Sequence, residues 1–248
     1  MADAILDGHS APALAVRLAL PSVELYERVS STMDLAHTAA ARGAAAGTLV
    51  LANAQHAGRG RAGRRWSSPP GSGLWMTLVE RPTSPGGLDV LSLRAGLLVA
   101  ESLDALAADR VQLKWPNDLY RRGGKLGGIL IETRWRDRRI EWVAIGLGLN
   151  VAPPENVEWA AGLASGVTRL QALDCIVPAL RSAAKAEGPL TLDELSRYAM
   201  RDLGVGRRVS EPAAGVVAGI GATGELMVDT PTGPRAFRSG SLVFSEGR

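Results

Sequence analysis

The sequence predicts an α/β protein of the α+β type with two parts. A mixed β-sheet with flanking helices is expected over residues 1–203, and a small β-barrel over residues 204–248. Hydrophobic residues make up 46% of the 248 residues, which is enough for a sizeable core. As far as residue 200, short apolar runs alternate with segments of helical periodicity. After Gly204 the segments become short and rich in turn residues, as in a small all-β unit.

The N-terminal segment contains one clear helix signal. Residues 1–20 are rich in Ala and Leu and are expected to fray in part. Ser31 and Thr32 then precede an apolar-periodic segment that ends at Gly43, which predicts an N-capped helix. Capping is the simplest role for these two hydroxyl side chains.

The remaining elements follow from periodicity and turn residues. The clearest helix covers residues 88–107, where apolar residues recur at steps of three and four. Pro116-Asn117-Asp118 predicts a tight turn that presents its two polar side chains outward. Strands are expected over 47–55, 74–80 and 111–115, a hairpin over 125–135 and 140–150, helices near 169–186 and 191–200, and C-terminal strands over 208–210, 214–220, 225–229 and 235–238.

Charge and cysteine content narrow the class of protein. The 28 basic residues face 25 acidic ones, so the net charge of +3 requires neither nucleic acid nor a membrane as partner. One cysteine, Cys175, excludes an internal disulfide and fits a reducing compartment. The first twenty residues lack a signal-peptide pattern, and the apolar runs are too short to span a bilayer. We therefore expect a cytoplasmic protein.

The chain is organised around a loop at Gly58–Trp66 that holds three glycines and four arginines. Its spacing matches the dinucleotide-binding pattern G-x-G-x-x-G, which must open a helix. Here the Pro- and Gly-rich stretch 67–73 follows, so this assignment fails. Two interpretations remain about equally good: a mobile cationic loop that closes over a phosphate or carboxylate, and a solvated basic loop.

Two further stretches also carry side chains suited to binding a phosphate or a carboxylate. Lys114–Asp118 places polar side chains on a tight turn, and Lys125 adds a point charge before a glycine-flanked strand. Phosphoryl or adenylyl transfer asks a protein mainly for positioning and charge neutralisation, which Arg and Lys supply. No histidine pair has metal-ligand spacing, so no metal site is predicted.

With these motifs the sequence resembles the biotin protein ligases, also called biotin–[acetyl-CoA-carboxylase] ligases. The resemblance covers about residues 22–151, with a weaker match to the family's small, SH3-like C-terminal β-barrel. The matching motifs occur in the family's order and near its spacing: Ser31-Thr32, Gln55 with Gly58–Arg64, Lys114–Tyr120, Lys125–Leu130 and Gly146–Asn150.

The resemblance implies a two-step reaction with biotin and ATP as substrates, ATP arriving as its Mg²⁺ complex, and no tightly bound cofactor. Biotin carboxylate attacks the α-phosphate to give biotinyl-5′-adenylate. A lysine of the biotin carboxyl carrier domain of a biotin-dependent carboxylase then displaces AMP.

The resemblance also implies roles for individual residues. Catalysis would rest on Arg61 and Lys125, with Asp118 assisting the incoming lysine. The biotin-binding residues would be Ser31, Thr32, Gln55, Gly58, Arg59, Arg61, Lys125, Gly127 and Gly128. The nucleotide-binding residues would be Arg61, Arg64, Trp66, Asn117, Lys125 and Asn150. Met33 departs from the family's usual Asn, and residues 152–166 depart from its pattern, so contacts at these positions are not carried over.

Other functions stay open at this point. One alternative is a lipoate–protein ligase, which has a related fold. A second is a nucleic-acid-binding module that uses the arginine loop with Trp66. A third is a binding protein without catalytic activity. The longer family members carry a helix-turn-helix domain, and only about twenty residues precede the catalytic pattern here, so no DNA partner is expected. The sequence does not decide the oligomeric state, and a homodimer is possible. The loop over residues 58–73 is expected to be mobile until an anion binds.

Overall fold

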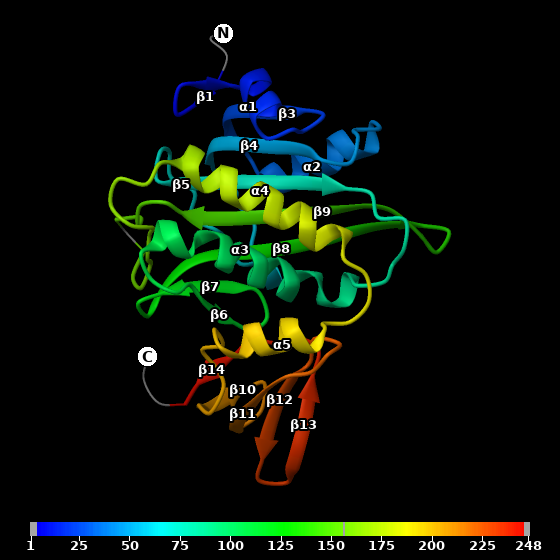
Figure 1. The fold of residues 1–248 in the computed structure, drawn as a ribbon, viewed down its shortest axis with the longest axis vertical. Helices are drawn as coiled ribbons and strands as arrows, with labels where there is room; N and C mark the ends of the chain where they lie inside the picture. Colours follow the sequence, from blue (N-terminus) through cyan, green and yellow to red (C-terminus); the bar gives the residue numbers. More distant parts are fainter. Residues whose placement is uncertain (1–3, 156, 246–248) are drawn as a thin grey trace.

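The structure, a computed structural model, describes residues 4–155 and 157–245. Its centre is a seven-stranded sheet in the order β3-β4-β5-β9-β8-β7-β6 (Figure 1). The strands are β3 (Val23–Val29), β4 (Thr48–Gln55), β5 (Gly73–Glu80), β6 (Gln112–Lys114), β7 (Asp118–Arg121), β8 (Gly124–Arg136) and β9 (Arg139–Asn150). Only β3 and β4 pair in parallel within this sheet, which confirms the predicted mixed sheet.

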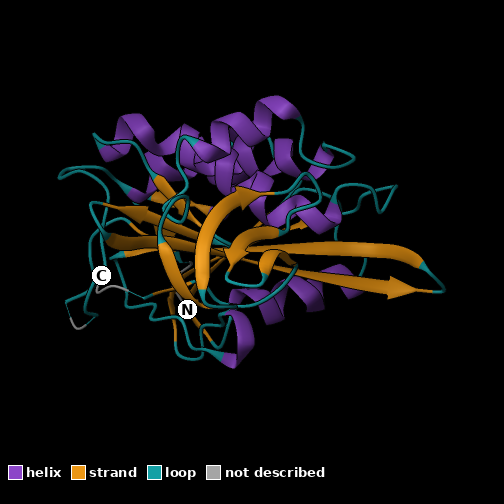
Figure 2. Ribbon diagram, turned by 90° about the horizontal axis from the view of Figure 1, so that it is seen from below, coloured by secondary structure: helices purple, strands orange, loops and turns teal. Residues whose placement is uncertain are grey.

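Helices cover both faces of this sheet (Figure 2). α2 (Thr32–Ala41) packs against β4, β5 and β9, while α3 (Leu91–Ala107) and α4 (Arg169–Lys185) lie on the opposite face. Because helices cover it on both sides, β5 is buried along its whole length. This explains why its sequence is a nearly continuous apolar run instead of an alternating one.

The N-terminal segment is folded where it is described, and the expectation of fraying is wrong for it. It forms β1 (Ile5–Leu6), β2 (His9–Ser10) and α1 (Ala11–Arg17), while residues 1–3 lie outside the described residues. Leu6 and Leu14 are 1% and 0% exposed, so the apolar residues of this segment belong to the core. Their burial offsets the conformational entropy that a loose terminus would keep.

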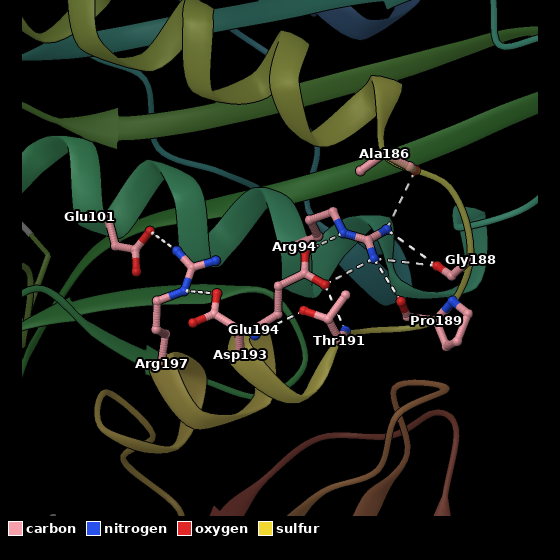
Figure 3. Close-up of polar contacts among 9 residues, drawn as sticks. All are labelled: Arg94, Glu101, Ala186, Gly188, Pro189, Thr191, Asp193, Glu194 and Arg197. Carbon is pink, nitrogen blue, oxygen red and sulfur yellow. Dashed lines mark hydrogen bonds and ion pairs between the residues drawn. The ribbon is translucent and has the colours of Figure 1, made fainter.

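A buried ion pair fixes α5 (Leu192–Ala199) against α3 (Figure 3). Arg94 is 1% exposed, and its Nε donates to Glu194 Oε1 at 2.6 Å. Its Nη2 donates to the carbonyl of Pro189 at 2.9 Å. Glu194 also closes a capping box with Thr191, and the hydrogen bonds from Arg94 are the main cause that lowers the pKa of its carboxyl. Removing one partner of such a buried pair would leave a charge without compensation.

The C-terminal segment is the predicted all-β unit, an antiparallel sheet in the order β13-β12-β11-β10-β14. Its strands are β10 (Arg208–Glu211), β11 (Gly215–Ile220), β12 (Leu226–Thr230), β13 (Gly233–Phe237) and β14 (Val243–Phe244). The chain leading into it adds to β6, because Leu113 N donates to Arg201 O and Leu203 N to Leu113 O, both at 2.8 Å. The indole of Trp115 donates to Gly224 O at 3.1 Å. These bonds place the turn after β6 beside the second sheet.

Candidate functional site

A cavity lies where the arginine loop crosses the helix α2 face of the large sheet. Its walls come from the N-terminus of α2, the ends of β4 and β7, strands β5, β8 and β9, and the loop itself. The lining residues are Ser31, Thr32, Met33, Gln55, Arg59, Gly60, Arg61, Arg64, Arg65, Trp66, Met76, Thr77, Asn117, Asp118, Lys125, Gly128, Ile129, Leu130, Gly146, Leu147 and Gly148. The lining combines a buried polar end at Ser31, Thr32 and Thr77 with apolar side chains and the cationic side chains of the loop.

The buried end holds hydroxyl and amide groups that are already joined to one another. Gln55 Oε1 accepts from Thr32 N at 2.8 Å, and the hydroxyls of Thr32 and Thr77 lie 3.0 Å apart. Ser31 caps α2, as predicted, by accepting from Met33 N at 3.3 Å, and its hydroxyl hydrogen can still donate. Thr77 is fully buried in a strand of apolar residues, and its role was missed because no motif surrounds it.

The loop supplies the cationic rim. Residues Arg61–Gly63 form a short 3₁₀ turn in which Ala62 adopts a left-handed conformation, with φ of 54°. Arg61 Nη1 donates to Asn117 Oδ1 at 3.3 Å. Burial lowers the pKa of the Arg61 guanidinium, Asp118 opposes that effect, and Arg64 adds to it. Partial burial of a group that stays charged is the arrangement expected of an anion-binding arginine.

Lys125 faces the loop from β8. Its ammonium forms an ion pair with Asp118 Oδ1 at 2.7 Å and lies 5.2 Å from the ring centroid of Trp66. Its main chain is held on both sides, because its N–H donates to Trp159 O and its carbonyl accepts from Asn150 Nδ2 at 3.3 Å. The structure therefore brings the three predicted catalytic residues together: Lys125 pairs with Asp118, and Asp118 affects the pKa of Arg61.

Asn117 fixes a turn beside the site by hydrogen bonds to the main chain, and the predicted glycines allow close packing there. Asn117 Nδ2 donates to Ile129 O at 2.7 Å and Ile129 N donates back to Asn117 O at 2.9 Å, which fixes the turn to β8. A Cβ at Gly128 would lie 3.3 Å from the Trp66 ring, and one at Gly127 would lie 2.9 Å from Gly148 O. Gly58 is packed in the same way, 2.5 Å from Trp66 O at the Cβ position.

The indole of Trp66 lies against the glycine surface of β8 and β9. A Cβ at Gly148 would overlap its Nε1. That nitrogen is buried and has no hydrogen-bond partner among the described residues. Lys125 covers the ring within cation–π distance. Trp66 is thus held by packing, with its ring between two cavities.

A second cavity adjoins the first, and the two share Arg65, Trp66 and Lys125. The second cavity extends to the C-terminal sheet, where Arg207 lies 3.5 Å from the ring centroid of Phe244. It is lined by Arg65, Trp66, Ser67, Lys114, Tyr120, Gly123, Lys125, Asn150, Pro154, Val157, Glu158, Trp159, Ala160, Leu203, Arg207 and Phe244. Of the predicted nucleotide residues, Trp66, Lys125 and Asn150 line this cavity, while Arg61, Arg64 and Asn117 line the first.

Arg207 and Phe244 were missed as site residues, because only the three-dimensional docking of the second sheet brings them near Trp66. Among residues 4–155 and 157–245, no group of three or more His, Cys, Asp or Glu side chains could hold a metal ion. Across the same residues, no helix has the length and apolar character needed to cross a membrane.

Comparisons with known proteins decide the family. The model of the biotin/lipoate A/B protein ligase family matches residues 25–150, which include both sides of the first cavity. The chain belongs to this family. A biotin–[acetyl-CoA-carboxylase] ligase of Paracoccus denitrificans is 32% identical over 232 residues, covering 82% of this chain and 93% of the relative.

Other family members are similar over a shorter stretch. The bifunctional ligase/repressor BirA of Bacillus spizizenii is 43% identical over 124 residues, covering 50% of this chain. The match spans 38% of that relative, well under two thirds of its length.

Solved structures of the family share the fold. The biotin protein ligase from Aquifex aeolicus in complex with biotin and ATP superposes with a TM-score of 0.76 at 24% identity, covering 92% of this chain and all of the other. The biotin protein ligase from Leishmania major in complex with biotinyl-5-AMP gives a TM-score of 0.62 at 25% identity, covering 88% and 98% of the two chains.

Proposed function

We propose that this protein is an ATP-dependent biotin protein ligase that forms biotinyl-5′-adenylate and transfers the biotinyl group to a lysine of a biotin carboxyl carrier domain. The observation that carries this proposal is the shared wall of the two cavities, where Lys125 and Trp66 face both. A carboxylate at the open end of the first cavity would meet an α-phosphate at the edge of the second. Relatives named as biotin ligases support the same assignment.

The first cavity favours biotin over lipoate. Biotin carries a ureido ring with two N–H donors and one carbonyl acceptor, whereas the dithiolane ring of lipoate offers no comparable donors. Thr32, Gln55 and Thr77 form a buried hydrogen-bonded end that matches such a polar ring. These groups already bond to one another, and their remaining donor and acceptor capacity can be used by a ureido ring and not by an apolar head group.

In the first step, an oxygen of the biotin carboxylate attacks the α-phosphorus and the bond to pyrophosphate breaks. Lys125 and Arg61 neutralise the charge that gathers between the carboxylate and the phosphate. Trp66 and the cationic second cavity hold the adenine and the phosphates, and Mg²⁺ arrives with the triphosphate, as is usual for this ion.

In the second step, the carrier lysine attacks the acyl carbon of the mixed anhydride and AMP leaves. The attacking amine must lose a proton. Asp118 is the carboxylate beside Lys125, and we assign it to receive or position that proton. The carrier domain is the expected partner for this step.

Pyrophosphate exchange into ATP tests the first step directly. Exchange that requires biotin and is not supported by lipoate is the expected result. A thermal-shift comparison of the two acids provides an independent readout of binding. Exchange with lipoate and not with biotin would assign the chain to the other branch of the family. Salt-sensitive binding to generic DNA, without exchange, would support a nucleic-acid-binding module instead.

A further inference from the structure

Arg59 is the loop arginine that forms ion pairs with the body of the protein. Its Nη1 lies 2.7 Å from Asp34 Oδ1 on α2, and its Nη2 lies 2.5 Å from Glu132 Oε1 on β8. By comparison, Arg61 and Arg64 each form a hydrogen bond of 3.3 Å. A planar guanidinium can hold two carboxylates from two elements at once, which a lysine ammonium does less well.

Glu132 is itself held by a chain of hydrogen bonds with a fixed direction. Its Oε2 lies 2.9 Å from His37 Nε2, and His37 Nδ1 lies 2.9 Å from Trp142 Nε1. An indole N–H can only donate, so His37 Nδ1 accepts and its Nε2 carries the hydrogen that goes to Glu132. The second carboxylate oxygen of Glu132 is then left facing Arg59.

The far end of this chain of hydrogen bonds, at Trp142, is packed into the protein. Trp142 is 7% exposed, and the guanidinium carbon of Arg81 lies 5.8 Å from its ring centroid. Arg81 in turn donates to the carbonyls of Ala44 and Glu141, both at 2.9 Å. Trp142 pairs with Arg134 across β8 and β9, on the same hairpin as Glu132. The orientation of Glu132 is therefore set by the sheet and α2.

We propose that Glu132 and His37 are positioning residues for the arginine loop. Through Arg59 they hold residues 58–66 over the first cavity before any ligand binds, in contrast to the ligand-free mobility expected from the sequence, so that Arg61 is already near the reacting groups. Arg59 then acts as an anchor of the loop and makes no direct contact with the biotin carboxylate. The consequence for ligation rests on the function proposed above, whereas the anchoring itself does not.

Amide hydrogen exchange of the ligand-free protein tests the anchoring. Glu132→Gln keeps the shape of the side chain and removes its charge, so exchange across residues 58–66 should become on the order of fivefold faster, the factor that a partly exposed ion pair supplies. Asp174→Asn is the matched control, because it breaks the Arg17–Asp174 pair of 2.7 Å far from the loop. It should leave the loop unchanged. Equal exchange in the wild type and Glu132→Gln would overturn the proposal, even in an active ligase.

A double variant tests whether Glu132 acts on the loop through Arg59. Once Arg59→Ala has removed the anchor, adding Glu132→Gln should accelerate loop exchange no further. Additive acceleration would mean that Glu132 acts on the loop by another route, and would contradict the proposal.

His37 offers a rescue experiment. His37→Ala removes the donor to Glu132 and should accelerate loop exchange, while His37→Gln keeps an N–H near the position of Nε2 and should restore slow exchange. Ala and Gln are both good helix formers, so neither substitution should disrupt α2. In an active ligase, Glu132→Gln should speed release of biotinyl-adenylate by the same factor as loop exchange. If Glu132→Gln slowed formation of biotinyl-adenylate without speeding its release, Glu132 would act at the reacting groups, and the proposed positioning role would be contradicted.

Discussion

At the scale of single residues, Lys125 is the fixed charge of the site. Its main chain is held at both its N–H and its carbonyl, and its ammonium lies between Asp118 and the Trp66 ring. Lys125→Ala should therefore slow adenylate formation about a hundredfold or more. Biotin affinity should change far less, because the buried polar end of the cavity is untouched.

Single-turnover kinetics with a matched lysine checks this prediction. Lys185 lies at the end of α4, away from the cavities, so Lys185→Ala should form adenylate at the wild-type rate. Wild-type kinetics in Lys125→Ala would remove the ammonium from the mechanism.

Arg61 differs because it belongs to the loop. Arg61→Ala should slow the first step and also speed release of biotinyl-adenylate, since the fork that bridges carboxylate and phosphate is lost. A release rate that matches the wild type would contradict this second role. Arg110→Ala is a suitable control, because Arg110 lines neither cavity.

At the scale of elements, the glycines of β8 and β9 act by making room for Trp66. Gly148→Ala would place a Cβ inside the indole and should displace the ring. We expect nucleotide affinity to fall about tenfold or more, as loss of a base-stacking aromatic does. Biotin affinity should change less, since the buried polar end of its cavity is formed by other residues. Isothermal titration with each ligand measures both.

Gly96→Ala is the matched control for this change. A Cβ at Gly96 in α3 would meet Leu113 at 3.6 Å, an ordinary contact, so this variant should fold and bind normally. Equal loss of both ligands in Gly148→Ala would indicate general damage to the sheet and contradict the specific role of Trp66.

Sequence patterns were sufficient to predict the long helices and strands and to select the candidate residues within the motifs. α2, α3 and the β8–β9 hairpin follow from strong periodicity and clear end signals. β3, β7 and β14 were missed: β7 and β14 have four and two residues, and β3 mixes apolar and charged residues. Such strands form because neighbouring strands pair with them, and single-sequence patterns do not record that.

The same limit applies to the site. Residues inside motifs, such as Gln55 and Lys125, could be nominated, while Thr77 and Arg207 could not, because tertiary packing alone brings them to the cavities. The ion pairs of Arg59 with Asp34 and Glu132 are likewise contacts between distant parts of the chain.

At the scale of the whole molecule, Asp202 marks the junction between the two sheets. Its main chain bridges to Leu113 of β6, its Oδ1 accepts from Gly204 N at 2.7 Å, and its Oδ2 is buried without a partner among the described residues. Burial raises the pKa of this carboxyl from 3.8 to about 6, and the hydrogen bond from Gly204 acts in the opposite direction.

The sign of this shift fixes a pH dependence. A folded-state pKa above the unfolded one contributes stability that is present below pH 3.8 and is lost as pH rises through about 6. Asp202→Asn keeps the acceptor for Gly204 and removes the buried charge. At pH 8 it should raise the free energy of unfolding by roughly 1–3 kcal/mol relative to the wild type, and by little at pH 4.

Thermal unfolding from pH 4 to pH 8 measures this difference. Asp229→Asn, on the exposed side of β12, should follow the wild type throughout. A gap between Asp202→Asn and the wild type that does not widen with pH would show that the carboxyl stays charged in the folded protein.

Transfer of biotin to a carrier lysine is the reaction that the whole arrangement of loop, cavities and second sheet is proposed to serve. Mass spectrometry of a biotin carboxyl carrier domain, incubated with this protein, biotin and MgATP, measures it most directly. We predict one added biotinyl group that requires both biotin and ATP and is lost when the acceptor lysine is replaced. An unmodified carrier, under conditions in which a known biotin ligase modifies the same domain completely, would contradict the proposed function.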